Sequence, residues 1–204
     1  MSDRTDNPMN IEQPASFAFN AENVARIKDV IAKYPEGKQA SACMPLLDLA
    51  QRQHDGWLPH AAMVHVAELL GMPEIRVYEV ATFYTMYNLK PIGKIHVQVC
   101  TSLPCWLRGS DEIVSKCKSV TGTDFGKTSD DGVFTMTETE CLGACVNAPM
   151  VQIGDDFYED LTPEAVERIL MALKNGEQVE PGPQNSRHSS EPEGGLTSLT
   201  GEGA

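Results

Sequence analysis

Apolar residues recur at helical spacing through the first half of the chain. After the capping residue Asn20, Val24, Ile27 and Ile31 follow at intervals of three and four. Three similar stripes lie between residues 41 and 87, separated by glycines and prolines. Residues 1–16 are polar and contain two prolines. The pattern predicts a polar arm over residues 1–16 and a bundle of four short helices over residues 17–92.

The period of the pattern changes to two after residue 93. Residues 94–100 alternate as a half-buried strand does, residues 133–140 and 150–153 predict two more strands, and a turn at 154–156 returns through Phe157 and Tyr158. Helical stripes over 109–122 and 162–176 complete a βα…ββα unit. The chain is therefore expected to be α+β, with a helical bundle followed over residues 93–176 by an α/β domain with a mixed sheet.

The last residues have a different composition. Residues 177–204 are rich in Gly, Pro, Ser and Glu, with few apolar residues. Such a segment buries too little apolar surface to fold by itself. The sequence predicts a flexible, disordered acidic tail over residues 177–204.

Charge and hydropathy exclude several classes of function. The formal net charge is −13, and no Lys/Arg cluster offsets it, so we expect no nucleic-acid binding. No apolar run approaches the roughly 18 residues that span a bilayer, and the polar start has no signal-peptide pattern. No Gly-x-Gly-x-x-Gly fingerprint follows a strand. These features predict a soluble, intracellular protein without a nucleotide site or direct membrane insertion.

Four of the six cysteines form two close pairs in the α/β unit. Cys100 and Cys105 follow the first predicted strand, and Cys141 and Cys145 follow the second. Loops at one end of a sheet can converge, and a [2Fe–2S] cluster takes four thiolates, two on each iron. Gly143 and Ala144 keep the second loop thin, so that backbone N–H groups can approach the bridging sulfides of a cluster. The other two, Cys43 and Cys117, lie on apolar helix faces and are expected to be packing residues.

The residues alone are also compatible with two other functions of these thiols, zinc binding and disulfide chemistry. Structural zinc also takes four thiolates, although its pairs are usually separated by two residues, whereas here the gaps are four and three. A thiol oxidoreductase usually carries Cys-x-x-Cys at a helix start, which this chain lacks. A cluster is favoured over a zinc-stabilised adaptor and over disulfide chemistry.

Residues near the cysteines also permit two interpretations. Trp106 either shields the cluster from water or is an ordinary core aromatic. Six acidic residues either lower the reduction potential of an anionic cluster or form a solvated face whose charges are screened. These residues are Glu138, Glu140, Asp155, Asp156, Glu159 and Asp160.

The cysteine spacing resembles that of a known family. Cys100-x4-Cys105 followed by Cys141-x3-Cys145 in a βα…ββα unit is similar to the thioredoxin-like [2Fe–2S] ferredoxins. Four stretches resemble the small thioredoxin-like subunit of respiratory complex I: residues 46–53, 56–59, 81–84 and 141–149. The resemblance extends over about residues 17–175.

The resemblance implies a function for the chain, although the tail after Gly176 lies outside it. Cys100, Cys105, Cys141 and Cys145 would bind one [2Fe–2S] cluster, while FMN and NADH would lie on a flavin-bearing partner subunit. The chain would be an electron-transfer subunit of a proton-pumping NADH:quinone oxidoreductase, with no active site of its own. It would lie on the cytoplasmic side of the inner membrane, or the matrix side in mitochondria. The equivalent subunit of a soluble NAD-linked hydrogenase or formate dehydrogenase is the alternative.

The bundle offers a possible surface for that partner. It carries small and aromatic residues close together, namely Ala81, Phe83, Tyr84 and Tyr87. Aromatic residues are enriched in protein interfaces. The other interpretation is that these four residues form the core of the bundle.

Overall fold

A computed structural model describes residues 11–192 and 194–198. Most of the predicted polar arm and the last six residues, 199–204, lie outside the described residues. Contacts within the chain divide it into two compact units, one ending at Ile92 and the other beginning at Gly93.

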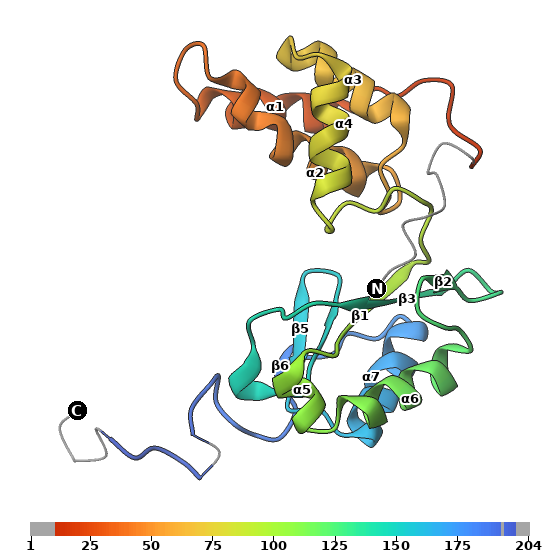
Figure 1. Cartoon of the computed structure of the whole chain (residues 1–204), viewed down its shortest axis with the longest axis vertical. Helices are drawn as coiled ribbons and strands as arrows, with labels where there is room; N and C mark the ends of the chain where they lie inside the picture. Colours follow the sequence, from red (N-terminus) through yellow and green to blue (C-terminus); the bar gives the residue numbers. More distant parts are fainter. Residues whose placement is uncertain (1–10, 193, 199–204) are drawn as a thin grey trace. The chain divides into compact units, whose positions relative to one another are not determined.

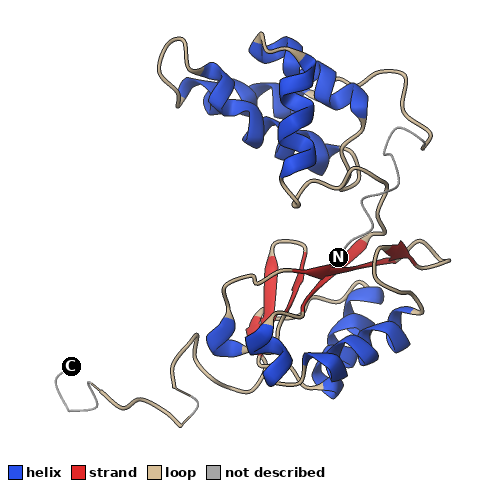
Figure 2. Ribbon diagram, viewed as in Figure 1, coloured by secondary structure: helices blue, strands red, loops and turns tan. Residues whose placement is uncertain are grey.

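The first unit is helical (Figures 1 and 2). Its elements are α1 (Ala21–Ala32), the 3-10 turn η2 (Gln39–Ala42), α2 (Cys43–Gln53), α3 (His60–Leu70) and α4 (Glu74–Phe83). The Asn20 side chain caps α1 by accepting the Asn23 N–H at 2.8 Å. Pro59 and Pro73 each stand just before a helix, and Gly71 ends α3 in the left-handed conformation at φ +61°. The four helices expected from the apolar stripes are present.

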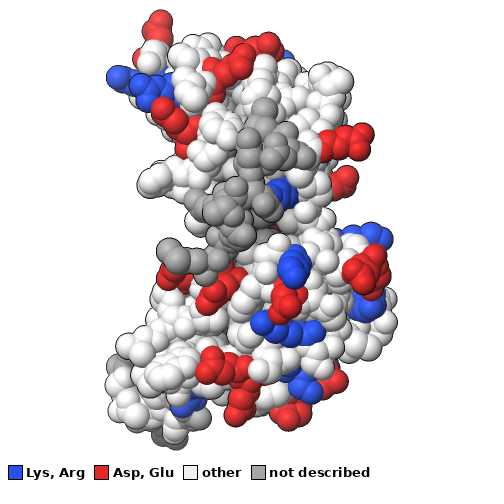
Figure 3. Space-filling view, turned by 45° about the vertical axis from the view of Figure 1, so that its right-hand side comes forward, with Lys and Arg blue, Asp and Glu red and all other residues white. Residues whose placement is uncertain are grey.

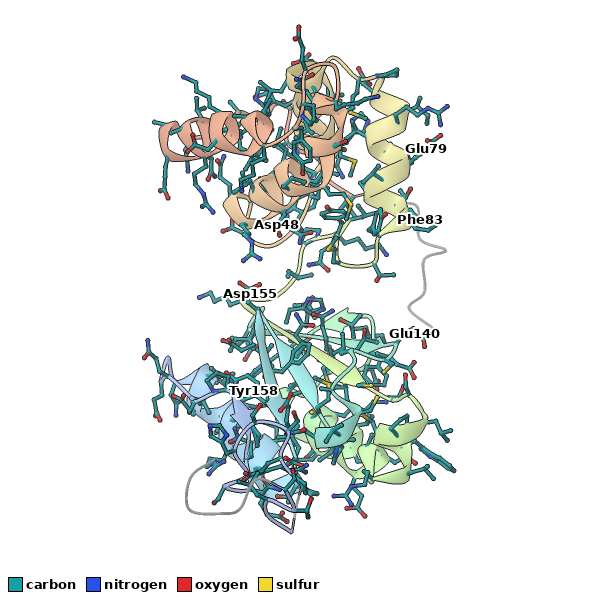
Figure 4. All side chains as sticks on the ribbon, turned by 90° about the vertical axis from the view of Figure 1, so that its left-hand side faces the viewer. Asp48, Glu79, Phe83, Glu140, Asp155 and Tyr158 are labelled. Atoms are coloured by element: carbon teal, nitrogen blue, oxygen red, sulfur yellow. The ribbon has the colours of Figure 1, made fainter. Side chains whose placement is uncertain are left out.

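The four bundle residues suggested as a partner surface divide into two kinds. Ala81 and Tyr87 are buried in the core, and the Tyr87 hydroxyl donates to the Met44 carbonyl at 2.9 Å. Phe83 and Tyr84 are exposed, and Figure 4 shows Phe83 and Glu79 projecting from the outer side of α4. Only the exposed two are available at the surface of this unit.

The second unit is built on one mixed sheet of six strands, in the order β2-β3-β1-β4-β5-β6. The strands are β1 (Ile95–Cys100), β2 (Lys127–Thr128), β3 (Phe134–Thr139), β4 (Val151–Ile153), β5 (Asp156–Glu159) and β6 (Gly182–Pro183). β1 runs parallel to β3 and antiparallel to β4. The helices are α5 (Leu103–Leu107), α6 (Ser110–Thr121) and α7 (Pro163–Lys174), with a 3-10 turn η3 (Cys145–Asn147). The mixed sheet expected from the sequence is confirmed.

Helices α6 and α7 lie side by side on one face of the sheet (Figures 1 and 2). Val97 and Phe134 point into this core, where they meet Ile113 of α6 and Ile169 of α7. Cys117 is completely buried in the same core, in agreement with the packing role expected for it. Alternation in β1 and β3 turns the intervening residues toward the opposite, half-buried polar face.

Part of the segment predicted to be a flexible tail makes regular contacts with the second unit in the structure. β6 pairs in parallel with β5, and Tyr158 lies opposite Gly182. Farther along, the Arg187 side chain forms an ion pair with Asp160, and both side chains are almost fully buried. Backbone pairing and a buried charge pair hold this polar segment, and neither produces an apolar pattern in the sequence.

Within the described residues, no helix is long and apolar enough to cross a bilayer.

Candidate metal centre

The parallel pairing of β1 and β3 brings both cysteine loops to one edge of the sheet. Cys100 is the last residue of β1 and lies opposite Thr139, the last residue of β3. The chain then continues into one loop toward Cys105 and into the other toward Cys141. A hydrogen bond of 2.8 Å from the Thr101 hydroxyl to Glu138 joins the two strand ends. The expected convergence of the loops thus follows from strand register.

The first cysteine pair is buried. Cys100 and Cys105 are each 2% exposed and pack in a small cluster with Ala148 and Met150. Cys105 lies in α5, a helical turn that the sequence pattern does not reveal. Burial, followed by a hydrogen bond with Cys100, raises the pKa of the Cys105 thiol to about 12. Without a metal the Cys105 thiol is therefore protonated at neutral pH, and both thiols are shielded from water.

The second pair is exposed. The sulfurs of Cys141 and Cys145 lie 3.3 Å apart, and the Gly143 N–H donates to Cys141 Sγ at 3.4 Å. The Gly143 N–H, followed by the hydrogen bond with Cys145, lowers the pKa of the Cys141 thiol. The same sulfur contact raises the pKa of Cys145. Gly143 has φ +86°, a conformation that disfavours a side chain, and its N–H is directed at the Cys141 sulfur rather than at a bridging sulfide.

The two pairs interact with each other. After the contact with Cys141 and burial, a negative charge on Cys100 would further raise the pKa of Cys145, and after burial and the contact with Cys100, one on Cys145 would further raise the pKa of Cys105. In the described part of the chain, no three His, Cys, Asp or Glu side chains surround one ion position. The donor set is instead two pairs of thiols with a backbone N–H directed at sulfur. These residues fit a [2Fe–2S] cluster, in which each iron takes two thiolates and N–H groups support the sulfurs.

Exposed apolar side chains stand on both cysteine loops. Leu103, Trp106, Leu107 and Val146 are 65%, 54%, 69% and 66% exposed, and they are called the apolar rim below. Trp106 is thus no core aromatic, and its indole N–H donates to Asp111 at 3.0 Å. Arg108 Nε donates to the Ala148 carbonyl at 3.4 Å, which connects the two loops. Large exposed hydrophobics in a group indicate a contact surface.

The six acidic residues do not form one solvated face. Glu140 and Asp155 are exposed, and Figure 4 shows Asp155 at the tip of the β4–β5 hairpin. Burial raises the pKa of Glu159. Asp160 is buried and paired with Arg187, a residue that the sequence analysis does not single out. Glu138 is bonded to Thr101 beside the cysteine loops.

A family model, that of the thioredoxin-like [2Fe-2S] ferredoxins, matches residues 27–174. The chain belongs to this family. Members carry one [2Fe–2S] cluster, as the name of the family states, and the resemblance seen in the sequence is confirmed.

Two relatives extend the match beyond the family model. The chain is 57% identical over 160 residues to a subunit of NADH-quinone oxidoreductase from Rickettsia bellii, a match that covers 78% of this chain and 96% of the relative. It is 50% identical over 183 residues to the mitochondrial NADH dehydrogenase [ubiquinone] flavoprotein 2 of Dictyostelium discoideum, covering 90% of this chain and 74% of the relative. Both matches are longer than the region that the family model covers.

A solved structure shares the fold. The NAD+-reducing [NiFe]-hydrogenase in its air-oxidized state contains a chain that superimposes with a TM-score of 0.56 at 16% identity. The match covers 64% of this chain and 23% of that one. At this identity the likeness concerns the fold alone.

Proposed function

We propose that this chain is the [2Fe–2S] electron-transfer subunit of an NADH–quinone oxidoreductase, with Cys100, Cys105, Cys141 and Cys145 as the cluster ligands. The single observation that carries the proposal is the placement of two thiol pairs at one sheet edge by parallel β1 and β3. The 57% identity to a bacterial subunit of that oxidoreductase supports the choice of parent complex. The chain is then a peripheral subunit of that complex, with no active site of its own.

The four cysteines and Gly143 would contribute to holding a cluster in different ways. A bound [2Fe–2S] cluster accepts and releases one electron at a time. Cys100 and Cys105 would hold it from the buried side of the site, and Cys141 and Cys145 would hold it from the exposed side. The Gly143 N–H stabilises negative charge on sulfur. The exposed second loop is therefore the side of the site from which a bound cluster would be accessible to an electron donor or acceptor.

The apolar rim is the part of this unit that we assign to the flavin-bearing partner. It lies on the two cysteine loops, so a partner seated there would approach the cluster closely. Interface cores are enriched in aromatic and apolar residues and poor in charge. FMN and NADH then belong to the partner. Replacing Trp106 and Leu107 by serine should weaken association with that partner while leaving the cluster spectrum unchanged.

Metal analysis and electron paramagnetic resonance test the ligand set. The purified chain should contain about two irons and about two acid-labile sulfides, and dithionite should produce a rhombic spectrum. Cys141→Ser should remove or strongly alter this signal. Cys43→Ala is the matched control, because Cys43 is buried in the helical unit, and its spectrum should stay that of the wild type. Stoichiometric zinc with no iron–sulfur signal would contradict the proposal.

The parent complex is tested by purification. An affinity tag on this chain should recover quinone-reducing subunits together with NADH dehydrogenase activity. Recovery of a soluble hydrogenase or formate dehydrogenase instead would leave the cluster assignment intact but would refute the assigned parent complex.

A further inference from the structure

A segment beyond the family match crosses the loop that carries the second cysteine pair. The family model ends at residue 174, whereas residues 182–191, here called the C-terminal strap, continue along the α/β unit. The strap begins with β6 beside β5, and the Gln184 N–H donates to the Glu159 carbonyl at 3.0 Å. It then reaches the backbone next to Cys145.

Arg187 is the centre of the strap's contacts. Its Nη2 pairs with Asp160 Oδ1, and its Nη1 donates to the carbonyls of Val146 and Glu191, both at 3.2 Å. The Arg187 and Asp160 side chains are only 6% and 3% exposed. Hydrogen bonds between buried charged groups are among the stronger ones in proteins. One guanidinium group therefore joins the strap, the residue after Cys145 and the residue after β5.

Asn147 completes the network from the loop side. Its side-chain N–H groups contact the Ser189 carbonyl at 2.8 Å and Asp160 Oδ2 at 3.3 Å, and its carbonyl accepts the Asp160 N–H at 2.7 Å. Asn147 is 2% exposed. Asp160 has φ +50°, a conformation uncommon for a residue with a side chain. The contacts on both sides fix this unusual backbone.

We propose that the C-terminal strap positions the second cysteine pair, with Arg187 as the positioning residue for Cys145. Cys145 is exposed and lacks the packing that immobilises Cys100 and Cys105. Its backbone is instead held through the adjacent Val146 carbonyl and through Asn147. The inference rests on the proposed function only in taking Cys145 as a cluster ligand. A ligand loop fixed by neighbouring hydrogen bonds binds its metal more tightly.

Hydrogen exchange on the full chain without metal tests the strap independently of any cluster. In Arg187→Gln, the amides of Asn147, Ala148 and Asp160 should exchange at least about ten-fold faster, because a buried charged hydrogen bond is lost. Arg168→Gln is the matched control. Arg168 contacts the same strap at Gln184, 3.0 Å away, but is exposed and does not contact the cysteine loop. In Arg168→Gln these three amides should exchange at the wild-type rate. Wild-type exchange rates at the same amides in Arg187→Gln would overturn the proposal.

Iron release provides the second readout. In the cluster-loaded chain, Arg187→Gln should lose iron to a chelator about ten-fold faster than the wild type and Arg168→Gln. Arg187→Lys keeps the charge but replaces the planar fork of guanidinium donors by a single ammonium nitrogen, which is poorly placed for three acceptors on different segments, so its rate should be intermediate. If Arg187→Gln does not fold, the test is made with Arg187→Lys. Iron loss at the wild-type rate in Arg187→Lys would refute the positioning role. A wild-type chain that takes up no cluster refutes the proposed function, while the exchange result on the strap still stands.

Discussion

His96 lies on the polar face of β1, where its Nε2 contacts the Thr137 hydroxyl. Burial lowers the pKa of His96 to about 4, from about 6.5 in an unfolded chain. The folded protein thus holds the imidazole neutral at pH values where the unfolded chain already binds a proton.

This difference predicts a pH dependence of stability at the scale of one residue. The contribution of His96 is fully present above about pH 6.5 and is lost as the pH falls toward 4, because protons then favour the unfolded state. The loss is on the order of 3 kcal/mol. Urea unfolding of the metal-free chain at pH 7.5 and pH 4.5 measures it. His96→Gln should flatten this part of the profile, and an unchanged profile would show that other groups cause it.

At the scale of elements, Gly93 determines how closely the start of the second unit approaches β3. A Cβ on residue 93 would lie 2.7 Å from the Val133 carbonyl oxygen and 2.9 Å from the Phe134 carbonyl carbon. Both atoms are backbone where β3 begins, and the Val133 carbonyl accepts the Ile95 N–H at 2.8 Å, so neither can move cheaply. The Gly93 N–H also donates to the Thr135 hydroxyl at 2.6 Å.

Gly93→Ala is therefore expected to destabilise the α/β unit by about 1–3 kcal/mol. Gly194→Ala is the matched control, since nothing lies within 4 Å of its added Cβ and its φ is not in the left-handed region. Thermal unfolding of the two variants compares them. Equal melting temperatures would mean that β3 adjusts without cost.

The same scale shows which elements a sequence can predict. Apolar stripes and flanking prolines predict α1 to α4, and alternation predicts β1 and β3, because these elements are long enough to show a period. β2 and β6 have two residues each, too few for any period. The convergence of the cysteine loops is predictable from strand ends. The pairing of Arg187 with Asp160 is not, since it joins positions far apart in the chain and has no local pattern.

At the scale of the whole molecule, each unit has its own hydrophobic core. One core contains Leu46, Leu47 and Val66, and the other contains Val97, Phe134 and Ile169. Exposed ion pairs cover the second unit, for example Lys116–Glu167 at 2.8 Å and Lys174–Asp131 at 2.9 Å. Figure 3 shows both signs of charge interspersed on its visible face. Separate cores indicate units that can fold separately.

We therefore expect residues 93–198 expressed alone to fold and to take up the cluster. Circular dichroism and the spectrum of the reduced fragment test this. Leu46→Ala in the full chain is the complementary variant: it should destabilise the helical unit by about 2–5 kcal/mol and leave the cluster spectrum unchanged. An unfolded fragment, or a changed spectrum in Leu46→Ala, would show that the units depend on each other.

Because Arg187 follows all four cysteines in the sequence, the parts of the site are synthesised in a fixed order. Synthesis proceeds from the N-terminus, and domains generally fold as units as they emerge. All four cysteines of the two pairs precede Arg187, as do both parallel strands that gather them. A growing chain therefore presents both thiol pairs before the strap exists. During synthesis the second cysteine loop therefore lacks its hydrogen bonds to the strap. It gains them only after residues 182–191 have been made.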